Sequence, residues 1–95
     1  MKTKNFKFYS DAGHGWLAVK KSEIQALNVT DQISSCSYQK GKTAYLEEDC
    51  DMGIFLRAYA QKHGEESFFV LHNAKSQRDV SPIRYYERYI SGVIK

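Results

Sequence analysis

The chain has little of what marks secreted, membrane-spanning or disordered proteins. Its 95 residues include one proline and two cysteines, Cys36 and Cys50. Two cysteines do not make a disulfide framework, so we expect free thiols in a reducing cytoplasm. No apolar run approaches the ~20 residues that a membrane span needs, and no apolar stretch follows the amino-terminal lysines as it would in a signal peptide. We therefore expect a cytoplasmic protein that has no membrane partner.

What is present is the composition of a folded chain, with 42% hydrophobic and 14% aromatic residues. The length predicts a single α+β domain over residues 1–95 with a modest core. The net charge of +3 is divided into blocks of +4 over residues 1–46, −4 over 47–66 and +3 over 67–95. Such blocks are usually solvated faces, but they also suit a bipolar surface that docks on a partner.

The hydrophobic pattern predicts two hairpins and a short helix in the first half of the chain. Residues 5–21 and 33–48 contain extended stretches around turn residues, as hairpins do. A helix of at most two turns is expected over 22–29, because Ser22 and Gln25 have the spacing of a capping box.

The second half predicts one main helix and a further strand. Apolar residues recur at i, i+3, i+4 and i+7 over 52–63, and Gly64 is well placed to end that helix. The apolar run 67–74 predicts a central strand. Residues 83–90 fit a short helix or a strand, and we prefer the helix. The order β-β-α-β-β-α-β-(α) describes a mainly antiparallel sheet packed against one main helix.

Just before the main helix lies an acidic run, Glu47-Glu48-Asp49-Cys50-Asp51. Aspartate at a helix start accepts hydrogen bonds from free backbone N–H groups, so we interpret Asp49 and Asp51 mainly as caps. An EF-hand starting at Asp49 would need glycine sixth and glutamate twelfth, and neither is present. Glu47 and Glu48 are adjacent on a strand, so their side chains point to opposite faces. We expect no metal ion and no cofactor, with another oxygen-rich cation site as the alternative.

His14 and the cysteines are the other residues with reactive side chains. His14 lies between two glycines, and we favour an exposed histidine on a tight turn over a general base or ligand. Hydrolytic or transfer chemistry would require His14 to converge with Glu47 or Glu48. Cys50 is near a helix start, which can lower a thiol pKa, but we favour a small buried residue.

The carboxy-terminal stretch interleaves arginine with tyrosine, a combination that suits protein hot spots and nucleic-acid backbones. The alternative is that the tyrosines close the core while the arginines are solvated. We predict a set of partner-binding residues from this stretch and the two regions above: Arg78, Arg84, Arg88, Tyr85, Tyr89, His14, Glu47 and Glu48.

Four strings lie within residues 11–86: "GHGWLAV", "SYQKGKTAYLEEDCD", "FLRAYAQKHGEE" and "SPIR". Together they resemble a family of small, largely uncharacterised proteins of phages and plasmids. The resemblance implies an accessory protein of a mobile element, acting in the bacterial cytoplasm on a host protein or defence complex. It implies no catalytic residue.

Residues 15–48 also have the order strand, short helix, "ALNV" stop, strand, turn, strand. This stretch resembles the looped-hinge-helix DNA-binding domains of AbrB-type regulators. DNA contact would then involve Lys20, Lys21, Lys40, Lys42, Arg78, Arg84 and Arg88, although the mild net charge predicts weak binding.

The sequence as a whole favours a non-enzymatic binding protein that docks on a host or defence protein and could inhibit it. A DNA-binding regulator is the alternative, and a small hydrolase or metal-binding protein is a more remote one. Both a monomer and a homodimer are compatible with this expectation.

Overall fold

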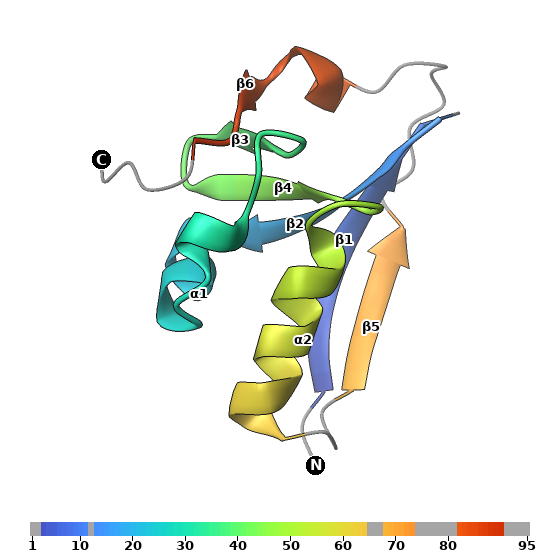
Figure 1. Ribbon diagram of the computed structural model, residues 1–95. Coiled ribbons are helices and arrows are strands. Elements are labelled where there is room, and N and C mark those ends of the chain that lie inside the picture. Colours follow the sequence, from blue (N-terminus) through green and yellow to red (C-terminus); the bar gives the residue numbers. More distant parts are fainter. Residues whose placement is uncertain (1–2, 12, 65–67, 74–81, 91–95) are drawn as a thin grey trace.

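The chain folds into a six-stranded, mainly antiparallel sheet with one main helix across one face (Figure 1). The computed structural model describes residues 3–11, 13–64, 68–73 and 82–90. The strands lie in the order β5-β1-β2-β4-β3-β6. The predicted α+β fold, with a mainly antiparallel sheet and a main helix, is therefore confirmed.

Two hairpins form the centre of the sheet. β1 (Thr3–Ser10) pairs antiparallel with β2 (Gly15–Lys20), and β3 (Tyr38–Lys40) pairs antiparallel with β4 (Thr43–Glu47). β2 also pairs antiparallel with β4, which joins the two hairpins. Gly41 has a φ of 60° in the β3–β4 turn, a conformation that glycine adopts without a Cβ clash. Both predicted hairpins are confirmed.

The short helix α1 (Lys21–Ala26) follows β2 directly. Its N-cap is Lys20, which makes no side-chain cap bond, so the predicted capping box starting at Ser22 is wrong. The reason is that the chain enters the helix immediately after the strand, which places Ser22 inside the first turn. The predicted "ALNV" stop is confirmed, since its asparagine, Asn28, has the left-handed φ of 61°. The 3-10 helix η1 (Thr30–Gln32) was not predicted.

The main helix α2 (Met52–His63) spans the predicted residues and ends at Gly64, which has a φ of 95°. Asp51 occupies the N-cap position, but its side chain makes no hydrogen bond to the helix backbone. The capping role predicted for Asp51 is therefore wrong, because its carboxylate binds other partners. Within the described part of the chain, no helix combines the length and apolarity needed to cross a membrane.

β5 (Phe68–Asn73) lies at the edge of the sheet, so the prediction of a central strand is wrong. It pairs in parallel with β1. Figure 1 shows α2 running beside β1 and β5. β4 and β1 run in the same direction, because both are antiparallel to β2. The crossover through α2 brings the chain back in the direction of β4, so β5 is parallel to β1.

The carboxy-terminal stretch is neither one helix nor one strand. A 3-10 helix, η2 (Pro82–Tyr85), precedes β6 (Glu87–Arg88), which pairs antiparallel with β3. The backbone N–H of Tyr89 also donates to the carbonyl of Ser37, at 2.9 Å. The preferred α-helix is wrong. Backbone groups that a helix would pair internally are instead bonded to β3 and to Ser37, the residue before it.

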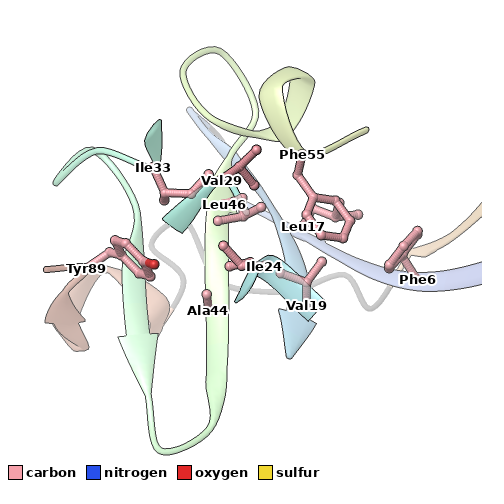
Figure 2. Close-up of a cluster of buried hydrophobic side chains, with 10 residues drawn as sticks. All are labelled: Phe6, Leu17, Val19, Ile24, Val29, Ile33, Ala44, Leu46, Phe55 and Tyr89. Carbon is pink, nitrogen blue, oxygen red and sulfur yellow. The ribbon is translucent and has the colours of Figure 1, made fainter. Parts of the chain in front are cut away.

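The main core lies between the sheet and the helices, as Figure 2 shows. Phe55 of α2 meets Phe6 of β1 edge to face, with ring centroids 5.5 Å apart. The cluster consists of Phe6, Leu17, Val19, Ile24, Val29, Ile33, Ala44, Leu46, Phe55 and Tyr89. A smaller cluster of Trp16, Tyr38 and Ile83 brings η2 against the sheet. Trp16 alternates with Leu17 along β2, so this second cluster lies on the face opposite α2.

Candidate functional site

The predicted carboxy-terminal binding residues do not form one exposed group. Tyr89 is 5% exposed and belongs to the main core, so its prediction as a partner-binding residue is wrong. Along the chain Tyr89 alternates with Arg88, and the alternation directs its ring inward. Tyr85 is 82% exposed. Arg78 and the side chain of Arg84 lie outside what the structure describes.

Arg88 is exposed, but its side chain also bonds β6 to the rest of the fold. Its Nη1 donates to the carbonyl oxygen of Ser35 at 3.0 Å, and its guanidinium carbon lies 4.6 Å from the ring centroid of Tyr38. Beside it, Nε2 of Gln39 donates to Glu87 at 2.9 Å. A substitution at Arg88 would therefore change the fold as well as any contact with a partner.

The sheet face opposite α2 carries cations and tyrosines in register. One row crosses from β1 to β6 and consists of Lys7, Ala18, Tyr45, Tyr38 and Arg88. The next row consists of Lys20, Thr43 and Lys40. Residues directly opposite each other on paired strands share one face, so the rows form one surface. We call its accessible part the open face, defined by Lys7, Tyr9, Lys20, Lys40, Tyr45 and Tyr86.

A groove of about 380 Å³ lies on the open face. Its lining includes two lysines, Lys7 and Lys20, two tyrosines, Tyr9 and Tyr45, and one acid, Glu23. Cations outnumber acids along this lining, so the groove favours negatively charged groups.

The tyrosines of the open face contact one another. The ring centroids of Tyr9 and Tyr45 are 5.9 Å apart in a T-shaped pair, and those of Tyr45 and Tyr86 are 5.2 Å apart. Nζ of Lys40 lies 4.8 Å from the ring centroid of Tyr86. Burial raises the pKa of Tyr45, and Tyr86 and Tyr9 add to this, so its hydroxyl stays protonated and can donate. These contacts hold the three tyrosine rings together on the open face.

On the same side of the sheet, His14 and Glu47 converge. Nδ1 of His14 lies 3.1 Å from Oε2 of Glu47, while the His14 ring remains exposed. Glu48 is exposed and does not join them. A Cβ added at Gly15 would lie 2.9 Å from Oε1 of Glu48 and 2.4 Å from the Phe8 ring, so Gly15 has no room for a side chain. The two glutamates thus point to opposite faces, as their adjacent positions predict.

Glu47 connects His14 to the two cysteines. Besides His14, its carboxylate accepts hydrogen bonds from the Asp49 backbone at 2.9 Å and from the Cys50 thiol. Burial raises the pKa of Glu47, but these hydrogen bonds together lower it below its usual value. The Cys50 thiol is also hydrogen-bonded to Cys36, which, with burial and the Glu47 charge, raises the pKa of Cys50 to about 12. Both cysteines are exposed, so the preferred interpretation of Cys50 as a small buried residue is wrong. The alternative, a lowered pKa of Cys50, is wrong as well.

This cluster does not present a nucleophile to a base. His14 and Cys50 both bind Glu47, so the carboxylate stands between the imidazole and the thiol, and the raised pKa keeps Cys50 protonated. Across residues 3–11, 13–64, 68–73 and 82–90, no group of three or more His, Cys, Asp or Glu side chains is placed to hold a metal ion.

The lowered pKa of Glu47 predicts a pH-dependent contribution to stability. The folded state favours the carboxylate, so the contribution is complete above the ordinary pKa of 4.5 and is lost as the pH falls through the lower folded value. Glu47→Gln should reduce the free energy of unfolding at neutral pH, and its difference from wild type should shrink below about pH 4.5.

Urea unfolding at several pH values from neutral to about pH 3 measures this difference. Glu48→Gln is the matched control, because Glu48 is exposed. A Glu47→Gln difference that stays constant over the whole range would contradict the assigned role of the carboxylate.

Comparison with known proteins found no relative of this chain. No protein-family model matches it, and neither does any curated protein or solved structure. The resemblances to phage and plasmid proteins and to AbrB-type domains therefore stay predictions, and the function must be argued from the site itself.

Proposed function

We propose that the protein is a non-enzymatic binding protein that docks through its open face on an acidic surface of another protein. The observation that carries this proposal is the placement of three exposed lysines, Lys7, Lys20 and Lys40, on one sheet face with partly buried tyrosines. Lysines pair with carboxylates and steer an acidic partner, while tyrosines supply rigid contact area at low entropic cost. Tyr85 precedes Tyr86 of the open face in the chain, and it adds an exposed ring.

The source of the partner follows from the resemblance to proteins of mobile elements. A host or defence protein in the bacterial cytoplasm is the expected partner, and inhibition of that protein is the expected consequence. Among the earlier candidates, Tyr85 and Arg88 remain in the proposed interface. His14 is exposed on the same sheet side and would contribute at its margin, whereas Glu47 is buried and holds the His14 ring in place.

Nucleic acid is the second candidate, because four lysines gather around the β3–β4 turn. Lys20 and Lys40 flank Thr43 in one cross-strand row, and the Lys21 backbone donates to the Lys42 carbonyl at 2.9 Å. It ranks second because the net charge of +3 is mild and predicts weak binding to phosphates.

A pulldown with the tagged full chain tests the protein-binding proposal. We expect a stoichiometric protein partner to be recovered from a nuclease-treated bacterial lysate, with binding that weakens as salt increases. Recovery of no stoichiometric protein would count against the proposal. So would a partner that binds equally well when the lysines of the open face are reversed in charge.

A salt titration with duplex DNA tests the second candidate. Phosphate contacts release counterions, so affinity must fall steeply with salt, and we expect weak binding at ~150 mM salt. Tight, sequence-selective retention at this salt, abolished by Lys20→Ala with Lys21→Ala, would place the DNA-binding function first.

A further inference from the structure

Two cysteines from separate segments meet at the protein surface. Cys36 lies in the bend before β3, and Cys50 lies just before α2. Their side chains are hydrogen-bonded to each other, and both thiols are free and exposed. A small molecule in solution can therefore reach the pair.

A partly buried hydrogen-bond network holds the two segments together independently of the thiols. Asp51, the neighbour of Cys50, accepts hydrogen bonds through Oδ2 from the Ser34 backbone at 3.1 Å and the Ser34 hydroxyl at 2.9 Å. The same oxygen accepts from the hydroxyl of Ser37. Residues on both sides of Cys36 are thus bonded to the residue after Cys50, which holds the two cysteine-bearing segments side by side.

We propose that Cys36 and Cys50 are a dithiol site that a low-molecular-weight disulfide, such as oxidised glutathione, converts into an intramolecular disulfide. The Cys36 thiolate first attacks one sulfur of the reagent, whose S–S bond breaks, and one reduced thiol leaves with the proton that Cys36 released. Cys50 then attacks the Cys36 sulfur of the mixed disulfide, and the second reduced thiol leaves with the Cys50 proton. The protein loses two electrons and two protons, which the reagent gains.

The order of attack follows from the contacts of Cys50. The Cys50 thiol is hydrogen-bonded to Cys36 and to the Glu47 carboxylate, and these contacts keep the thiol protonated. Because the thiolate is the attacking species, Cys36 attacks first and Cys50 resolves the mixed disulfide.

Reaction of the reduced full chain with oxidised glutathione tests the site. We expect wild type to lose both titratable thiols, with a mass decrease of two hydrogens and no glutathione adduct. Cys50→Ser should keep one glutathione on Cys36 as a stable mixed disulfide. Cys36→Ser should react more slowly than Cys50→Ser, because Cys50 keeps its contact with the Glu47 carboxylate in that variant. Both positions are exposed, and thermal melting checks that the serine variants fold.

Peptide mapping of oxidised wild type provides a measurement that needs no variant, and we expect a Cys36–Cys50 cross-link within one chain. Adducts on both cysteines of wild type, disulfide-linked dimers, or unchanged thiols would each overturn the proposal. Faster reaction of Cys36→Ser than of Cys50→Ser would overturn the assigned order of attack.

Discussion

Replacing Asp51 with alanine is expected to lower the free energy of unfolding by about 3–5 kcal/mol. Asp51 is 2% exposed, and its Oδ2 accepts hydrogen bonds from the backbone and hydroxyl of Ser34 and from the hydroxyl of Ser37. The alanine variant leaves these donors without their acceptor. The Ser37 hydroxyl is buried and the Ser34 bonds are partly buried, and an unsatisfied buried donor costs about 1–3 kcal/mol. Ser37 is fully buried, so water cannot replace the lost acceptor without a rearrangement.

Urea unfolding at neutral pH measures this loss, with Asp49→Ala as the matched control. Asp49 is an exposed aspartate two residues away, and its replacement should change stability by less than about 0.5 kcal/mol. Asp51→Asn keeps one acceptor oxygen, so we expect an intermediate loss. Equal effects of Asp51→Ala and Asp49→Ala would show that the hydrogen bonds to the serines do not stabilise the fold.

The different roles predicted and found for Asp51 show what local sequence rules can detect. Its position at a helix start was predicted correctly, because capping preferences depend on residues within one turn. Its actual partners lie 14 and 17 residues earlier in the chain, at Ser37 and Ser34. A cap rule does not include such partners, although the serines around Cys36 were a signal that hydroxyl donors were available.

Elements whose partners are close in sequence were predicted well. Both hairpins and α2 follow from alternation, turn residues and a helical repeat, which act over a few residues. β5 and β6 were predicted less well, because their places depend on β1 and β3, far away in sequence. The apolar run of β5 predicts a strand, but it does not predict which edge the strand joins or its direction.

The open face could be predicted only in part. Lys7 and Tyr9 alternate with Phe6 and Phe8, so the sequence indicates that they share one face. That Lys20 joins them on that face depends on the register between β1, β2 and β4, which the sequence alone does not specify. Because arginines and tyrosines are concentrated near the carboxy terminus, most of the partner-binding residues were predicted in that stretch instead of on the open face.

Reversing Lys7 and Lys20 to glutamate is expected to weaken binding to the partner protein by about a hundredfold, or about 2.7 kcal/mol. Both side chains are exposed and line the groove of the open face. Their reversal replaces two attractions to partner carboxylates with two repulsions. Lys40 and Arg88 are left unchanged, because each packs on a tyrosine ring of the fold and its loss would disturb the surface itself.

Titration of the purified partner against wild type and the Lys7→Glu, Lys20→Glu variant at two salt concentrations measures the effect. The matched control is Arg57→Glu with Lys62→Glu, which makes the same change in net charge on α2, over the opposite side of the sheet. Screening by salt should reduce the difference for the first variant, and the control should bind within a few-fold of wild type. Equal losses in the two variants would mean that net charge, not the open face, determines binding, and the docking surface would then have to be sought elsewhere on the molecule.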